Sequence, residues 1–101
     1  MPKHSIIVSK KASAMLDRHV EFLARVSPKA ADRLRVKVMN EIRGIEANPE
    51  GFPLWCPHFN LRKPFRRIIV EKRYMILFTV HDKKVVVAYI IDTRMNNEEI
   101  I

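Results

Sequence analysis

Residues 65 to 91 read FRRIIVEKRYMILFTVHDKKVVVAYII and contain three runs rich in β-branched and aromatic residues. The runs are Arg66 to Val70, Tyr74 to Val80 and Val85 to Ile91. They are separated by breaks of three and four residues, which are long enough only for antiparallel hairpins. The sequence therefore predicts a three-stranded antiparallel meander. Neither break contains Gly or an Asn-Gly pair, so the turn types stay open.

The N-terminal half has helical periodicity. Ser9 stands at an N-cap position, and residues 10 to 25 are predicted to form an amphipathic helix. Ser27-Pro28 is a second start signal, and Asn48-Pro49 ends that helix because the proline ring disfavours helical geometry at the preceding residue. The apolar stripes consist of Ala12, Met15, Leu16, His19, Val20 and Leu23 in the first helix, and Ala31, Leu34, Val38, Ile42 and Ile45 in the second.

A short β-branched run from His4 to Val8 precedes these helices and is predicted to form a first strand. The element order is then β-α-α-β-β-β. This order predicts an α+β fold in which the helical hairpin packs on one face of a small, mainly antiparallel sheet. At 101 residues the chain is expected to be a single domain, 1–101.

The connection from 49 to 64 is rich in Pro and carries three bulky aromatics, Phe52, Trp55 and Phe59. We expect an irregular segment whose aromatic side chains cover one edge of the core. A platform on which nucleic-acid bases stack is the alternative.

Both faces of the last two predicted strands are largely apolar, and two helices can cover only one of them. Met75 and Leu77 belong to the face that the helices leave open, and residues 95 to 101 supply few apolar side chains to cover it. An oligomer contact is the alternative, and we expect a protein partner on this face, in contact with Met75 and Leu77.

Composition excludes several classes. The chain is 48% apolar and 30% charged, which is ordinary for a globular protein, and its apolar runs are far shorter than the about 20 residues that a membrane-spanning helix needs. We expect no membrane association and no secretory signal, because the N-terminus lacks an apolar segment of sufficient length. The single cysteine, Cys56, fits a reducing cytoplasm.

Signatures of common enzyme chemistry are missing from the sequence. Two Gly leave no phosphate-cradling loop, and one Cys with four scattered His gives no metal-binding spacing, so neither a cofactor nor a metal is expected. Cys56 and His58 form the one nucleophile–base pairing, and in a Pro-rich loop such a pair is most often structural.

The charge distribution is the first feature that points to a function. The net charge is +8, and six basic residues lie between Arg62 and Arg73 against one acid, Glu71. Such a cluster suits a polyanion or an acidic protein, and a solvated sheet edge is the plainer interpretation.

Taken together, the chain resembles the RelE/ParE superfamily, the small toxins of bacterial type II toxin–antitoxin modules, which include plasmid-stabilisation systems. The likeness is carried by the strand and helical hairpin at the start, and by the segments 65–70, 73–80 and 85–96. It implies a cytoplasmic toxin that arrests growth and is neutralised by a small acidic antitoxin.

The RNA-cleaving branch of that superfamily cuts mRNA on the ribosome with basic residues and often a Tyr. Arg66 and Arg94 match its basic positions, and Tyr89 is a further candidate, so these three are the catalytic candidates. Ile68 and Met75 stand where that branch has basic side chains. The ParE branch lacks most of these groups and inhibits DNA gyrase, and the resemblance leans toward it.

Three hypotheses follow. The leading one is a toxin that inhibits a protein target, DNA gyrase. The second is a ribosome-dependent mRNA endoribonuclease, and the third a nucleic-acid-binding module without toxicity, which the charge alone would favour. The residues predicted to bind the target are Arg66, Arg67, Lys72, Arg73 and Arg94.

Overall fold

The computed structural model describes residues 4–55 and 65–94. In chain order its elements are β1 (Ser5–Val8), α1 (Lys10–Ala24), α2 (Pro28–Ile45), a 3₁₀ turn (Pro49–Gly51), β2 (Leu54–Trp55), β3 (Phe65–Val70), β4 (Tyr74–His81) and β5 (Lys84–Asp92). The α+β architecture and the order β-α-α-β-β-β are as the sequence predicts. The 3₁₀ turn and β2 are not predicted from the sequence, because they lie in the stretch that is expected to be irregular.

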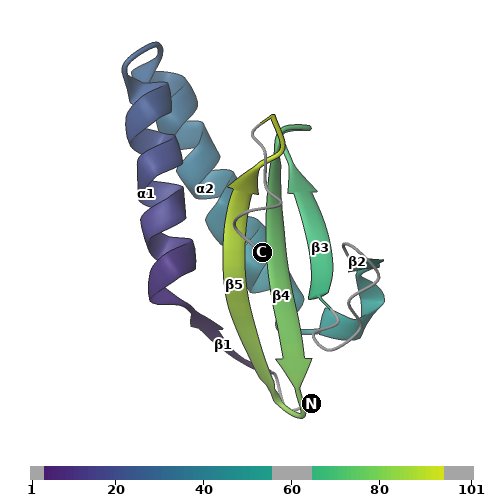
Figure 1. Cartoon of the computed structure of the whole chain (residues 1–101). Helices are drawn as coiled ribbons and strands as arrows, with labels where there is room; N and C mark the ends of the chain where they lie inside the picture. The colour runs from purple at the N-terminus through teal and green to yellow at the C-terminus, as the bar shows by residue number, and fades with distance from the viewer. Residues whose placement is uncertain (1–3, 56–64, 95–101) are drawn as a thin grey trace.

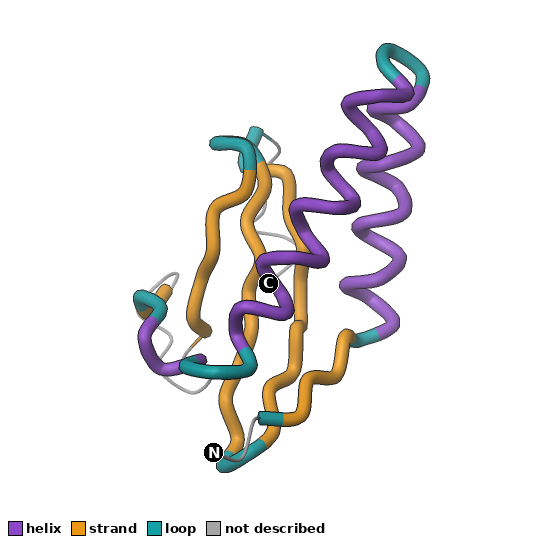
Figure 2. The backbone as a smooth tube through the Cα atoms, turned by 180° about the vertical axis from the view of Figure 1, so that it is seen from behind, coloured by secondary structure: helices purple, strands orange, loops and turns teal. Residues whose placement is uncertain are grey.

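One mixed sheet carries all the strands, in the order β1-β5-β4-β3-β2 (Figure 1). β1 runs parallel to β5, with Ser5 opposite Lys84, and the other neighbours are antiparallel. Seen from behind, α2 crosses the strands diagonally and covers one face, while α1 stands beside them (Figure 2). The opposite face of β3, β4 and β5 is called the open face below.

Both helices begin where the sequence predicts. The Ser9 hydroxyl accepts a hydrogen bond from the Ala12 amide at 3.0 Å, and the Ser27 hydroxyl accepts one from the Ala30 amide at 3.2 Å. Pro28 occupies the first turn of α2, where no intrahelical amide bond is lost. These caps fix the hairpin, because each helix starts at one residue rather than fraying over several.

The main core lies between the helices and the sheet. All five predicted stripe residues of α2 are buried in it or at its margin, and in β4 it takes Tyr74, Ile76 and Phe78. The aromatic ring of Phe52 packs edge-on against Phe78, with 5.8 Å between centroids. The prediction that aromatics of the connection cover the core is therefore confirmed for Phe52, whereas Phe59 lies outside the described residues.

A smaller second core occupies the open face. It consists of Met15, Phe65, Met75, Leu77 and Ile91, with Trp55, Ala88 and Tyr89 packed around it. Met15 belongs to α1, so the first helix contributes to both cores. α1 reaches the open face because it lies along the edge of β5 rather than on the covered face.

The outer edge of β5 forms hydrogen bonds with β1 at its start and with Ser9 and α1 further along the strand. The Ser9 amide donates to the Val87 carbonyl at 3.0 Å, and the Ser9 hydroxyl donates to the Ala88 carbonyl at 3.1 Å. Further along α1, Nε2 of His19 bonds the Ile90 carbonyl at 2.8 Å. The β4–β5 register shifts next to Ala88, because Leu77 is opposite Tyr89 while Phe78 is opposite Val87.

The hairpin turns use left-handed backbone without Gly. Glu71 and Lys72 both have positive φ, at 54° and 58°, and the Arg73 amide closes the turn on the Val70 carbonyl at 3.2 Å. Two central residues with positive φ suit the right-handed twist of the strands. Such residues cost about 1–2 kcal/mol each outside Gly, so the surrounding contacts must hold them.

We expect Leu34→Ala to lower the free energy of unfolding by about 2–5 kcal/mol, because Leu34 is 2% exposed and its removal leaves a cavity in the main core. Val36→Ala, two residues away on the same helix, is the matched control, since Val36 is 58% exposed. Urea titration of both variants measures the difference. A loss below about 1 kcal/mol for Leu34→Ala would mean that this face of α2 is not core.

Candidate functional site

The open face is arranged in cross-strand rows. Arg67, Leu77 and Tyr89 form one row, and Ile69, Met75 and Ile91 form the next. Toward the β4–β5 turn, Thr79 is opposite Val86, and the last pair is His81 with Lys84. Leu77, Met75 and Ile91 in the middle of these rows are buried and form an apolar floor, whereas Ile69 at one side is 44% exposed. Arg67 and the pair of His81 with Lys84 make the ends of the face polar.

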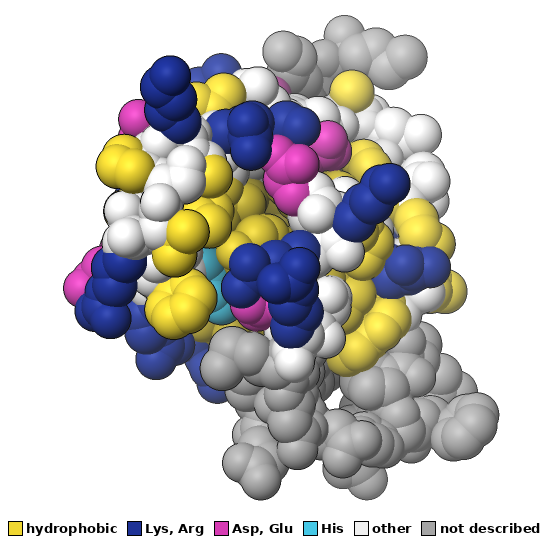
Figure 3. All heavy atoms as spheres, turned by 90° about the horizontal axis from the view of Figure 1, so that it is seen from above, with side chains coloured by type: hydrophobic (Ala, Val, Ile, Leu, Met, Phe, Trp, Pro, Cys, Tyr) yellow, Lys and Arg dark blue, Asp and Glu magenta, His cyan; other side chains and the backbone are white. Residues whose placement is uncertain are grey.

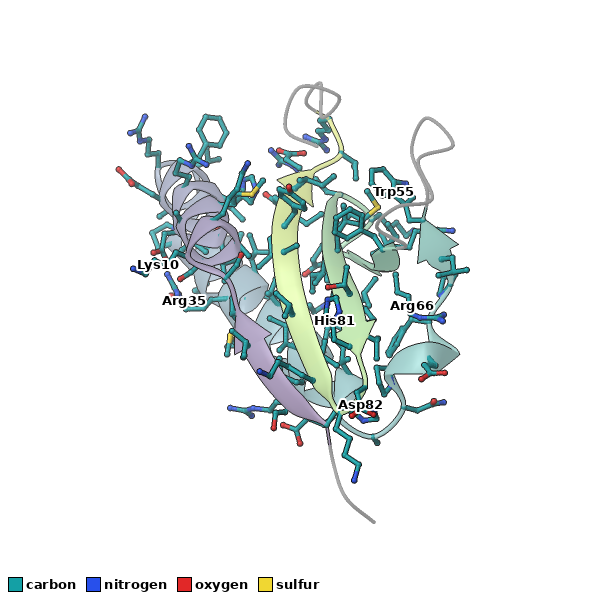
Figure 4. All side chains as sticks on the ribbon, turned by 60° about the horizontal axis from the view of Figure 1, so that its bottom comes forward. Lys10, Arg35, Trp55, Arg66, His81 and Asp82 are labelled. Carbon is teal, nitrogen blue, oxygen red and sulfur yellow. The ribbon has the colours of Figure 1, made fainter. Side chains whose placement is uncertain are left out.

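Basic side chains surround this floor. Arg67, His81 and Lys84 belong to the strand positions of the open face, and Nζ of Lys11 lies 5.0 Å from the ring centroid of Tyr89. Nε2 of His81 forms a hydrogen bond with the Thr79 hydroxyl at 2.9 Å. Figure 4 labels His81, the last residue of β4, and Trp55, the last residue of β2. The described strand positions of this face carry no Asp or Glu. The face therefore suits an acidic segment with apolar side chains.

The sequence predicted that Met75 and Leu77 contact an antitoxin. The structure places both in the second core, at 6% and 0% exposure. Their side chains already belong to one buried cluster with Met15, Phe65 and Ile91 of this chain. A partner on this face would touch mainly the exposed residues around them, and the contact of Met75 and Leu77 with an antitoxin stays a prediction.

A network of hydrogen bonds and charged groups joins the start of β4 to the end of β5. Nε and Nη2 of Arg73 donate to Oδ2 of Asp92 at 3.1 and 2.9 Å. The Arg94 amide donates to Oδ1 of the same carboxylate at 3.0 Å. Thr93 donates from its amide and its hydroxyl to the Arg73 carbonyl, at 2.8 and 2.6 Å. The Asp92 carboxylate therefore holds Arg73 and Arg94, and the Arg73 carbonyl holds Thr93.

The electrostatics follow from this geometry. Burial by itself would raise the pKa of the Asp92 carboxyl, but the hydrogen bonds from Arg73 and the Arg94 amide outweigh it, so the pKa lies below its ordinary value. The hydrogen bond to Asp92 raises the pKa of Arg73 further. Burial raises the pKa of the Tyr74 phenol. His19 lies against Tyr74, with 5.2 Å between ring centroids.

The turn between β3 and β4 is held from the side of α2. The Glu71 carboxylate lies 3.2 Å from Nε of Arg33 and 3.2 Å from Nζ of Lys37. These pairs help to hold Glu71 in its left-handed conformation. Lys72 is exposed beside it, and the described part of the structure records no ion pair for its ammonium group. Figure 3 looks down on this end and shows Lys and Arg side chains gathered around acidic and hydrophobic ones.

Arg66 has a structural role that the sequence did not predict. Its Nη1 donates to the carbonyls of Phe52 at 2.7 Å and Glu50 at 3.2 Å. Figure 4 labels Arg66, whose guanidinium thus bonds the segment around the 3₁₀ turn. β2 continues from that segment, with Trp55 opposite Phe65. The side chain thus ties the connection to the start of β3.

The three catalytic candidates do not form one constellation. Arg66 is opposite Phe78, whereas Asp92, two residues before Arg94, is opposite Tyr74. Four residues along a strand span about 13 Å, and β4 lies between β3 and β5. Tyr89 is on the open face, with its ring 5.7 Å from that of Phe65. The predicted target-binding residues are likewise divided, because Arg67 lies on the open face and Lys72, Arg73 and Arg94 lie near the strand ends.

Sequence reasoning missed Glu71 and His19 as organising residues, and it missed the bond from Arg73 to Asp92. Asp92 directly follows the last apolar run, and a charged residue at that position was a usable signal. Glu71 and His19 gave no such signal, because their partners are 34 or more positions away in the chain.

Within residues 4–55 and 65–94, no group of three His, Cys, Asp or Glu is placed to hold a metal ion. No helix in the same ranges is long and apolar enough to cross a membrane. Cys56 and His58 lie outside the described residues.

The chain matches the family model described as the ParE toxin of the type II toxin–antitoxin system parDE, over residues 6–97. It is also similar to a solved chain of the chromosomal ParDE toxin–antitoxin system from P. aeruginosa. The TM-score is 0.70 at 16% sequence identity, and the match covers 88% of this chain and 95% of the other. No curated protein matches the sequence.

We expect Asp92→Asn to lower the free energy of unfolding by about 1–3 kcal/mol near pH 7, because the Arg73 guanidinium loses its charged acceptor. The depressed pKa of Asp92 stabilises the folded state above about pH 4, and this contribution is lost as the pH falls through the folded-state value. Thermal unfolding at pH 3, 5 and 7 tests this. The difference in melting temperature between the wild type and the variant should be smaller at pH 3 than at pH 7. An equal difference at all three pH values contradicts the argument.

Proposed function

The chain belongs to the ParE family of toxins of type II toxin–antitoxin systems, and from this premise we propose that it arrests growth in the cytoplasm by inhibiting a protein target, DNA gyrase, and that an acidic antitoxin neutralises it. The observation that carries the choice of a protein target is the separation of the candidate catalytic side chains. A ribonuclease needs several donors within hydrogen-bond reach of one phosphate.

Two further features support this choice. Ile68 and Met75, which stand where the RNA-cleaving branch has basic residues, are 7% and 6% exposed and belong to the two cores. Arg66 already donates to two backbone carbonyls, which leaves less of its guanidinium for a phosphate. Arg94 is exposed beyond β5 with its backbone held by Asp92, so its side chain is presented to a partner from a fixed point.

The open face supports the antitoxin part of the proposal. Its basic rim and apolar floor complement an acidic segment with apolar side chains, and the net charge of +8 would attract such a segment at long range. Ile69 and the exposed margins of the face would be the first apolar groups to be covered.

We expect Arg94→Ala to reduce growth arrest while the free energy of unfolding and antitoxin binding change little, because its backbone bond to Asp92 is kept. Lys83→Ala is the control, since Lys83 is an exposed cation in the opposite turn, between β4 and β5. Colony counts after induction measure toxicity. Supercoiling by gyrase and primer extension on cellular mRNA identify the target. Cleavage of mRNA that Arg94→Ala abolishes would replace this proposal with the ribonuclease.

Arg67→Gln together with Lys84→Gln should weaken binding of the antitoxin encoded beside this chain about tenfold, because two cations leave the rim of the open face. The matched control neutralises two exposed cations of α2, Lys29→Gln and Arg43→Gln. Calorimetric titration of purified toxin at 50 and 300 mM salt gives both affinities. Equal losses in the two double variants would count against the open face as the antitoxin surface.

A further inference from the structure

The tip of the helical hairpin, residues 22–29, stands beyond the end of the sheet (Figures 1 and 2). It carries two large apolar side chains in the open, Phe22 at 59% and Val26 at 80% exposure. Phe22 lies in the last turn of α1 and Val26 lies two residues beyond the end of that helix at Ala24, so both belong to one small patch at the tip.

The exposure of this patch follows from the length of α1. Met15 and Phe22 are seven residues apart, which is two helical turns, so both lie on the same side of α1. Met15 is 4% exposed because it packs in the second core. His19 bonds Ile90 near the end of β5, and Phe22 lies almost one turn beyond His19. This side of α1 therefore extends beyond the strands that would cover it.

The patch has basic neighbours. Arg18 and Arg25 are four residues before and three residues after Phe22, on the same side of α1. Lys29 follows in the first turn of α2. The pair between Arg25 and Glu21 is 3.7 Å long with both side chains more than 70% exposed, so it holds Arg25 only weakly. The tip is thus an apolar projection with a cationic rim.

We infer that the hairpin tip inserts into an apolar pocket with an acidic rim on the protein whose inhibition arrests growth. This inference rests on the proposed function and adds the contact surface to it. A projecting patch needs a concave partner, and its cations need acidic groups. A second copy of the chain does not fit, because two tips that both carry a cationic rim repel each other.

The test compares two double variants that each replace two exposed apolar side chains. Phe22→Ser with Val26→Ser removes the tip patch. Val36→Ser with Met39→Ser removes two other exposed apolar groups, at 58% and 39% exposure, from the middle of α2. Both are measured for thermal unfolding, binding of the antitoxin encoded beside the chain, growth arrest after induction, and the concentration that halves gyrase supercoiling.

The tip variant should keep its fold and its antitoxin affinity, and should need roughly 30-fold more protein for the same inhibition, the effect of truncating an interface anchor. The α2 variant should match the wild type. Arg18→Glu with Arg25→Glu should also weaken inhibition, because it removes the cationic rim.

Several results would overturn the inference. Full toxicity of the tip variant places the target contact elsewhere. Loss of antitoxin affinity alone assigns the tip to the antitoxin, and a wild-type dimer that the tip variant dissolves assigns it to a second copy. Cleavage of mRNA that depends on Phe22 assigns it to the ribosome. A wild-type chain that does not arrest growth refutes the proposed function itself, and this inference falls with it.

Discussion

The structure depends on the hydrogen bonds that β1 and α1 give in turn to the outer edge of β5. Ser9 donates to Val87 and Ala88 and at the same time caps α1, so the chain changes from strand to helix without leaving the edge. His19 continues the same bonding to Ile90. The arrangement covers an edge that would otherwise expose unpaired carbonyls, and it carries Met15 around to the open face.

The charged end of the sheet is a second consequence of this arrangement. Arg73 and Asp92 are partly desolvated, and such a pair gains little free energy over an apolar one, so its value here is positional. The carboxylate fixes Arg94 through its amide, and the Arg73 carbonyl fixes Thr93. Glu71, held by Arg33 and Lys37, orients the neighbouring turn. A short left-handed turn and a strand end thus present cations at fixed points.

The fold was largely predictable, because its signals are local. Caps at Ser9 and Ser27, the stripe of α2 and the three β-rich runs each depend on neighbours within a few residues. The site was predictable only as a set of cations. The roles of Arg66 and Arg73 depend on bonds to Phe52 and Asp92, which are set by register and not by periodicity. Burial of Met75 and Leu77 likewise depends on Met15 arriving from α1.

Family membership fixes the scaffold and leaves the chemistry to particular side chains. Ile68 and Met75 face opposite sides of the sheet, one in each core, with Ile76 opposite Ile68 in the main one. A basic side chain at either position would have to be desolvated or displace its apolar neighbours, at a cost of several kcal/mol. The packing of both cores therefore disfavours basic side chains at these two positions. Basic side chains at both positions would require both cores to be repacked around β3 and β4.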